Sequence, residues 1–345
     1  MKKSLIALAV LAATGAAMAQ SSVTLFGRLD AGVGVIDKET TGAAPVASQS
    51  QTVVNSSTFN TTYWGMKGTE DLGGGLKANF NLQSGFAIDT GVGNTGLFER
   101  LATVGLSGGF GAVNLGRQYS PYYDLFGATD NIDDANVATT GAVYGKGIGQ
   151  STVTRASNSI RYDSPSFSGL SVSALVGLGE NENVAPNVGD ATNIFSLNII
   201  YKAGPLLVGY AHHQEKLTQA VLTTPQDENT YDMVGATFDF GMAKVTGGYQ
   251  QVSNDSGTDD KEFNAGVKVP VGTAATVYLG YADSNTSKAG FDLNSQGYTL
   301  AGTYNMSKRT KLYASYDATE LEKGTPGAVS TDETSRFAVG VVHLF

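Results

Sequence analysis

The sequence has no cysteine, few charged residues and, after its first twenty residues, no long apolar run. Its 345 residues carry only 15% charged side chains, whereas ordinary soluble domains carry about 25%. Without cysteine the chain can form neither a disulfide framework nor a thiolate metal site. No later stretch approaches the roughly 20 consecutive apolar residues that a membrane-spanning helix needs. These absences exclude a disulfide scaffold and argue against helical membrane spans.

The N-terminal residues have the pattern of a secretory signal peptide. Lysines at positions 2 and 3 precede an apolar run, which closes on the small-x-small pattern at 17–19. We therefore expect residues 1–19 to be removed and residues 20–345 to form an exported domain. The formal net charge is −9 and the basic residues are dispersed, so nucleic acid is not an expected partner.

Alternation of polar and apolar residues dominates the remaining chain. Lys77, Asn79, Asn81 and Gln83, for example, are interleaved with apolar residues, which is the pattern of a strand with two differently solvated faces. Each such segment runs for about ten residues, the length that a tilted strand needs to cross a bilayer. Sixteen segments have this pattern: 22–35, 56–70, 76–86, 97–107, 111–119, 154–163, 170–178, 192–202, 205–214, 229–239, 243–253, 260–269, 274–284, 294–305, 310–318 and 333–345.

The connections between these segments alternate in length. Short ones contain the Gly, Pro and Ser residues of tight turns. A soluble sandwich or jelly roll would not explain the strict alternation. The expected fold class is therefore all-β, a 16-stranded antiparallel transmembrane β-barrel with no second domain. The long polar connections lie at 37–55, 87–96, 120–153, 179–191, 215–228, 254–259, 285–293 and 319–332.

The last strand segment supports the barrel independently. Phe337, Val339, Val341, His343 and Phe345 share one face, and the last of them is an aromatic residue. This ending resembles the signal by which the outer-membrane assembly machinery recognises unfolded barrels. The alternative is an edge strand that happens to end in phenylalanine.

Six segments, in chain order, carry a family resemblance. They are SVTLFGRLD at 22–30, GMKGTEDLGGGL at 65–76, LFERLATVGL at 97–106, GRQY at 116–119, NSIRY at 158–162 followed by Pro165 and Gly169, and VHLF at 342–345. The ordered set resembles the Gram-negative general diffusion porins, especially those of betaproteobacteria. The resemblance covers nearly the whole chain after residue 19. It implies a homotrimer in contact with outer-membrane lipid and lipopolysaccharide, which passes ions and small hydrophilic solutes without any cofactor.

The resemblance also implies that the third long loop folds into the barrel and narrows it to an eyelet. In this sequence that loop is residues 120–153, and it is the longest loop. By similarity Asp130 and Asp134 match the eyelet carboxylates, and Asp133 is an additional candidate. A solvated loop tip is one alternative for these acids. A calcium site built from Asp130, Asn131, Asp133 and Asp134 is another.

The same resemblance implies a cationic wall that faces the loop acids. Arg28, Arg100 and Arg155 stand where the family places Lys or Arg, whereas Tyr63 replaces a cation that the family commonly has. Opposed charges across a wet constriction create a transverse field that favours polar solutes and selects ions by sign. Net acidity favours cations and the arginines favour anions, so the sequence leaves the sign open. The arginines could also be solvated lumen residues with no part in selectivity.

Two further functions remain open, and enzymatic activity is not expected. The same eyelet could prefer particular substrates, such as dicarboxylates or peptides. The barrel could instead be a surface receptor or adhesin that binds through loops 37–55 and 179–191. The three histidines have no zinc-ligand spacing and no catalytic motif occurs, although His212 could serve a hydrolase of the outer-membrane phospholipase kind.

Overall fold

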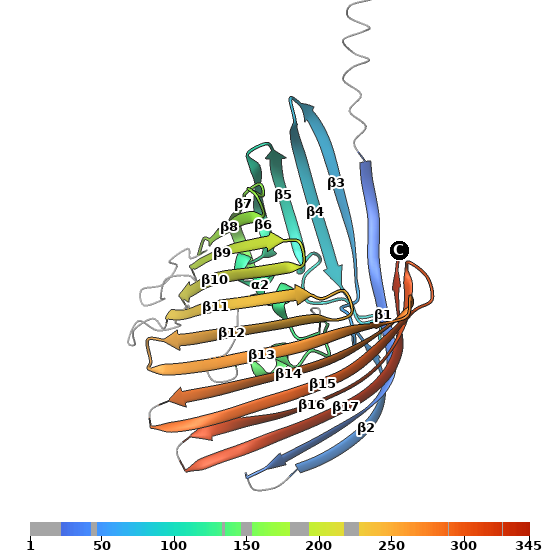
Figure 1. The fold of residues 1–345 in the computed structure, drawn as a ribbon, viewed down its shortest axis with the longest axis vertical. Coiled ribbons are helices and arrows are strands. Elements are labelled where there is room, and N and C mark those ends of the chain that lie inside the picture. The colour runs from blue at the N-terminus through green and yellow to red at the C-terminus, as the bar shows by residue number, and fades with distance from the viewer. Residues whose placement is uncertain are drawn as a thin grey trace, which may run out of the picture.

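A computed structural model describes residues 22–42, 47–132, 135–145, 154–179, 193–216, 228–288, 290–325 and 327–345. In these ranges no helix has the length and apolar character needed to cross a membrane. The strands form one antiparallel sheet that closes on itself (Figure 1). The elements are β1 (Ser22–Thr41), β2 (Ala47–Ser56), β3 (Tyr63–Gly73), β4 (Leu76–Gly85), β5 (Leu101–Gly108), β6 (Gly111–Tyr119), α2 (Pro121–Thr129), α3 (Thr140–Val143), β7 (Arg155–Asp163), β8 (Leu170–Gly177), β9 (Ile194–Ala203), β10 (Leu206–Lys216), β11 (Glu228–Asp239), β12 (Lys244–Asn254), β13 (Thr258–Val271), β14 (Ala275–Lys288), β15 (Phe291–Asn305), β16 (Thr310–Thr325) and β17 (Ala328–Leu344).

Seventeen strands fill sixteen positions around the barrel, which confirms the predicted fold class. The reason is that β2 and β3 share one position. The C-terminal part of β1, residues 31–40, pairs with β2, and its N-terminal part, residues 22–28, pairs with β3. Residues 57–62 interrupt the ladder between the two strands, and Ser57 adopts a positive φ of 61° there. The sequence predicted one strand at 56–70, so this interruption was not foreseen.

The ring closes where the first and last strands meet. β17 pairs antiparallel with β1 from Arg28 opposite Leu344 to Thr41 opposite Thr331. The backbone amide of Gly27 donates to the carbonyl of Phe345 at 3.1 Å, and the amide of Phe345 donates back at 3.1 Å. Closure leaves no open edge between β1 and β17, so their backbone groups are paired without help from water.

The outer surface exposes many apolar side chains and includes a belt of aromatic residues. Several of these residues face each other across neighbouring strands, such as Tyr281 opposite Tyr298 and Tyr316 opposite Phe337. Such belts mark the boundary between hydrocarbon and water. The aromatic residues of this belt are Tyr210, Tyr249, Phe263, Tyr281, Tyr298, Tyr316 and Phe337, of which Tyr281 is half-buried and the others are exposed.

Four of the expected long loops are wrong, because the strands continue through most of them. Residues 37–41 extend β1 and 47–56 form β2, where a loop was expected at 37–55. The expected loops at 285–293 and 319–332 are likewise largely strand, and the expected loop at 254–259 shortens to a turn at 255–257. Outside the bilayer both faces of a strand are wet, so the apolar alternation disappears while the backbone ladder continues. The polar residues Asp37 and Glu39 on β1 show this loss of alternation.

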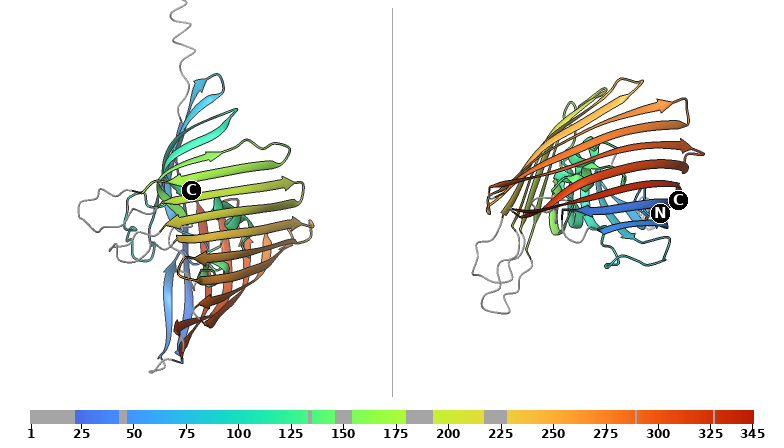
Figure 2. Two further views of the ribbon diagram at one scale, coloured as in Figure 1. Left: turned by 90° about the vertical axis from the view of Figure 1, so that its left-hand side faces the viewer. Right: turned by 90° about the horizontal axis from the view of Figure 1, so that it is seen from below.

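The connection between β6 and β7 lies inside the barrel, as the resemblance implied. The right-hand view of Figure 2 shows this green segment, which carries α2 and α3, within the ring of strands. α2 contacts strands β8 to β12, and α3 contacts β14 to β16. The two helices of the loop therefore follow the inner wall from β8 to β16.

Candidate functional site

The helix α2 begins the loop inside the lumen, and its start is fixed by local sequence. The Ser120 side chain accepts a hydrogen bond from the amide of Tyr123 at 3.1 Å, and Pro121 occupies the first helical turn. Both residue types are favoured there, since serine satisfies a free amide and proline needs no donor. Asn198 on β9 also donates to the Pro121 carbonyl at 2.7 Å. The wall and the helix cap together set the direction in which the loop leaves β6.

A track of glycines on the inner wall receives the loop. A Cβ atom on Gly266 would lie 2.2 Å from the carbonyl oxygen of Asn131, and one on Gly235 would lie 2.6 Å from the Thr129 hydroxyl. These separations are too short for any side chain, so only glycine lets the loop approach so closely. The glycines in contact with the loop are Gly209 on β10, Gly235 on β11, Gly266 on β13, Gly280 on β14 and Gly297 on β15.

A buried polar network holds α2 and the end of α3 against the same wall. Tyr122 donates to Gln250, which in turn donates to Glu262. The Glu262 carboxylate also accepts from the Gly145 amide and from the Ser284 hydroxyl, the latter at 3.0 Å. Burial raises the pKa of the Tyr122 hydroxyl well above its usual value, so this group stays protonated and remains a donor.

The middle of the loop is attached to the interruption between β2 and β3. The amide of Asn136 donates to the Phe59 carbonyl at 2.9 Å, and its side chain donates to the Ser57 carbonyl at 2.7 Å. Phe59 is buried among loop residues that include Ile132 and Val137. The interruption therefore works as a dock for the loop on the side of the barrel opposite α2.

Asp30 on β1 organises this dock. Its fully buried carboxylate accepts hydrogen bonds from the amides of Phe59, at 2.7 Å, and Asn60. Tyr313 on β16 donates to the other carboxylate oxygen at 2.9 Å. A buried carboxylate is stable only with several donors, and these three fix segment 57–62 against β1.

The arginines predicted for the cationic wall lie together, with tyrosines between them. The Arg28 guanidinium lies 5.4 Å from the centre of the Tyr63 ring, and the Arg100 guanidinium lies 4.9 Å from it. Arg100 and Arg155 both donate to the Tyr119 hydroxyl, at 3.0 and 2.7 Å. Arg100 is also close enough to Arg28 and Arg155 to be repelled by both charges. We call these five residues the arginine–tyrosine ladder.

The ladder has no carboxylate partner in the part of the chain that the structure describes. The ion pairs found there all involve other cations, such as Arg161 and Arg336. The Nε atoms of Arg100 and Arg155 are buried and have no hydrogen-bond partner among the described residues. Among the described residues, the positive charge of this face is therefore not balanced by a direct ion pair.

Another cation, Arg161, anchors α2 to the wall next to the ladder. Arg161 on β7 forms ion pairs with Asp124 at 2.5 Å and with Asp163 at 2.7 Å. It also donates to the Tyr119 backbone carbonyl at 2.9 Å. Burial raises the pKa of the Asp124 carboxyl above its usual value, and Arg161 opposes that rise. Arg161 thus ties the acidic start of the loop to the strand that carries Tyr119.

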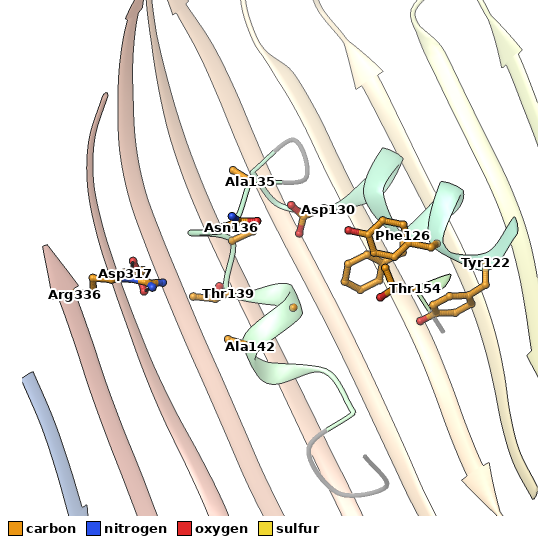
Figure 3. A pocket seen from close by; sticks show the side chains of 13 residues that line it. Tyr122, Phe126, Asp130, Ala135, Asn136, Thr139, Ala142, Thr154, Asp317 and Arg336 are labelled. Carbon is orange, nitrogen blue, oxygen red and sulfur yellow. Dashed lines mark hydrogen bonds and ion pairs between the residues drawn. The ribbon is translucent and has the colours of Figure 1, made fainter. Parts of the chain in front are cut away.

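Asp130 lines a cavity of about 350 Å³ between the loop and the opposite wall. Figure 3 shows Asp130 after the end of α2, with Asp317 and Arg336 across the cavity. Those two form a bidentate ion pair, with hydrogen bonds of 3.0 and 2.9 Å. Asp130 itself is buried and accepts from the Ile132 amide at 3.3 Å.

The structure thus brings Arg28, Arg100 and Arg155 together on one face and places Asp130 on the loop. Asp133 and Asp134 lie outside the described residues. Within those residues no group of three or more His, Asp or Glu side chains could hold a metal ion. His212 lies on the outward face of β10 and contacts Asp232 at 2.9 Å.

Sequence reasoning missed the residues that position the site. The alternation of β1 and β3 places Asp30 and Tyr63 on the lumen face, but it could not reveal that Asp30 holds the dock. Tyr63 was interpreted only as a lost cation, whereas it lies between two arginines. Arg161 and Asp124 are far apart in sequence, and no local pattern indicates their contact.

Known proteins resemble this chain over nearly its whole length. The Gram-negative porin family matches residues 5–324. Outer membrane porin protein 32 of Delftia acidovorans is 38% identical, with 100% of both chains covered. An outer membrane porin protein of Bordetella pertussis is 30% identical over 91% of this chain and 93% of its own. The solved structure of the anion-selective porin from Comamonas acidovorans gives a TM-score of 0.79 at 28% identity, covering 94% of this chain and 100% of that one.

The solved Comamonas acidovorans porin shares the fold of this chain. The chain therefore belongs to the Gram-negative porin family, and it is an outer-membrane channel for the passive diffusion of ions and small hydrophilic solutes.

Proposed function

We propose that the channel prefers anions, and that its selectivity arises where the arginine–tyrosine ladder faces the inward loop. Arg28, Arg100 and Arg155 form the cationic side of this constriction. Asp130, Asp133 and Asp134 form the acidic side. The observation that carries the proposal is the absence of a carboxylate partner for the three arginines within the described residues.

The physical reason is the unequal compensation of charge on the two sides. Charge on a narrow, water-filled passage sets a well for ions of the opposite sign and a barrier for the others. The three arginines have no carboxylate partner among the described residues, whereas Asp130 is buried on the loop. The related Comamonas acidovorans porin is named anion-selective, which supports the same sign here. The chain's net charge of −9 includes acids such as Asp37 and Glu39 that lie far from the ladder.

We further propose a signal peptide, a trimeric assembly and the lack of catalytic activity. Residues 1–19 are the signal peptide, and residues 20–345 form the barrel. The barrel assembles as a homotrimer in outer-membrane lipid and lipopolysaccharide, which is supported by the short strands β4 to β8 beside the much longer β13 to β17. A low wall of this kind suits a side that neighbouring subunits cover. We also propose that the protein catalyses no reaction, as expected for a member of a family of channels.

Planar-bilayer recording tests the selectivity directly. The reversal potential in a KCl gradient should show anion preference for the unmodified protein. Replacing both Arg100 and Arg155 by Gln should shift the potential toward cation preference. Lys261→Gln is the matched control, because Lys261 is exposed on the outer face of β13. An unchanged potential in the double variant would remove these arginines from the constriction.

A further inference from the structure

An aromatic stack joins the arginine–tyrosine ladder to the inward loop. The rings of Tyr119 and Tyr123 are stacked, with centres 5.3 Å apart and planes only 8° apart. Tyr123 is stacked in turn on Phe126, with 5.6 Å between centres and 18° between planes. Tyr119 ends β6, whereas the other two lie on α2, so the stack crosses from the wall to the loop.

The wall end of this stack is strongly electropositive. The Arg155 guanidinium lies 4.4 Å from the centre of the Tyr119 ring, on which Tyr123 is also stacked. The Tyr119 hydroxyl accepts from Arg100 and Arg155, at 3.0 and 2.7 Å. A phenol has two acceptor sites and one proton to donate. With both acceptor sites filled by cations, the Tyr119 proton is left as a donor, and it has no acceptor among the described residues.

The stack lies between two cavities of the lumen. Tyr123 and Phe126 line the cavity of about 350 Å³ that also contains Asp130. Tyr119 lines a second cavity of about 500 Å³, which continues along β3, β4 and β6 toward the short-turn end of the barrel. The stack therefore borders both cavities, with its cationic end on the Tyr119 side. Tyr119 and Tyr123 are both half-buried, so parts of their rings face the passage.

Resting on the anion-preferring function proposed above, we infer that this stack is a binding subsite for aromatic monocarboxylates such as benzoate. The solute carboxylate accepts from the Tyr119 hydroxyl and from the guanidinium groups of Arg100 and Arg155. Its ring packs against Tyr123 and Phe126. Inorganic anions and aliphatic carboxylates use only the first half of the site, because they have no aromatic face to offer.

Charge alone would not discriminate between carboxylates of equal size. Aromatic pairs gain attraction beyond simple burial because the ring edge is positive and the ring face is negative. A saturated ring fills the same space but lacks this quadrupole. The subsite therefore predicts a measurable preference between two solutes that differ only in aromaticity.

Block of single-channel current by two matched acids tests the inference in the unmodified protein. Benzoate and cyclohexanecarboxylate have the same charge and similar size. We expect benzoate to interrupt the KCl current saturably, with a half-blocking concentration about three- to tenfold lower. Equal half-blocking concentrations, or no saturable block by benzoate, would overturn the inference.

A pair of tyrosine variants assigns the preference to the stack. Tyr123→Leu removes the central ring, so benzoate should fall to the potency of cyclohexanecarboxylate. Tyr304→Leu is the matched control, since Tyr304 lies on the outer face of β15 and is 52% exposed; it should keep the preference. A conducting Tyr123→Leu channel that still prefers benzoate would contradict the assignment. If that variant gives no channels, the comparison in the unmodified protein still decides.

The two proposals fail in different measurements. The reversal potential in a KCl gradient without any organic acid reports ion preference alone. A channel that prefers chloride but treats both acids alike would refute the aromatic subsite and leave the proposed function intact. A channel that prefers potassium would refute the proposed function.

Discussion

Two faces of the same lumen use opposite kinds of residue. The face formed by β1, β3, β6 and β7 carries arginines and tyrosines whose long side chains reach into the water-filled passage. The face formed by β10 to β15 carries glycines, on which the inward loop lies. Both faces consist of the same antiparallel ladder, so the backbone does not distinguish them. The comparison shows that glycines let the loop approach and narrow the barrel on one face, while long cationic side chains place charge on the other.

The largest expected effect comes from separating the loop from the dock between these faces. Asp30→Ala leaves the amides of Phe59 and Asn60 and the Tyr313 hydroxyl without their buried acceptor. Each orphaned donor costs about 1–3 kcal/mol, so the free energy of unfolding should fall by about 3 kcal/mol or more. Urea unfolding in detergent measures it. Asp37→Ala, an exposed position on the same strand, should change it by less than about 0.5 kcal/mol.

A single methyl group on the glycine face should have the next largest effect. Gly266→Ala places a Cβ atom 2.2 Å from the Asn131 carbonyl oxygen, so the loop must move away from the wall. Overpacking of this kind costs about 1–3 kcal/mol, and the conductance should change as well. In Gly302→Ala the new methyl lies 3.9 Å from its nearest neighbour. If both variants behaved like the unmodified protein, the loop would not depend on the glycine track.

The link between α2 and the arginine face is weaker. Asp124→Asn replaces the charged partner of Arg161 by a neutral one, while Arg161 keeps Asp163. The Asp124 side chain is 34% exposed, so water screens the pair and the loss should be about 1 kcal/mol. Thermal unfolding compared with the exposed Asp255→Asn variant measures it. A loss as large as that of Asp30→Ala would mean that Arg161 is the main support of the loop.

The smallest expected effect is a change in ion preference when one charge is added to the arginine face. Tyr63→Arg restores the cation that the family resemblance led us to expect in β3. One added charge at roughly 7 Å in water changes ion preference by about two- to threefold, so the anion-to-cation permeability ratio should rise by that factor. Tyr63→Phe keeps the ring and should leave the ratio unchanged. A lower ratio in Tyr63→Arg would indicate that the tyrosine is needed to hold Arg28 and Arg100 in place.

The barrel could be predicted from sequence because its lipid-exposed segments alternate strictly. Segment 111–119 coincides with β6, and the other segments match their strands closely except near the outer end of the barrel. There the signal fails for a physical reason: Asp37 and Glu39 continue β1 with water on both faces. The interruption at 57–62 was missed because it depends on Asp30, a residue on another strand.

Only part of the site could be predicted from the sequence. Arg28, Arg100 and Arg155 were found through resemblance, and the structure brings them together. The glycine track was not foreseen, since a glycine in a strand gives no indication of what approaches it. Tyr119 and Tyr123 are near in sequence, but their stacking depends on the turn from β6 into α2. Contacts of this kind arise from the closed barrel, which no local pattern encodes.

The glycine track also bears on how such channels diversify. Where the loop rests on bare backbone it needs no matching side chain on the wall, so a different insert would require changes at only a few wall positions, such as Gln250, Glu262 and Arg161. The width of the pore and its permeability could then vary through one segment of about thirty residues, while the surrounding strands keep their register. The barrel and its inward loop could therefore change largely independently of each other.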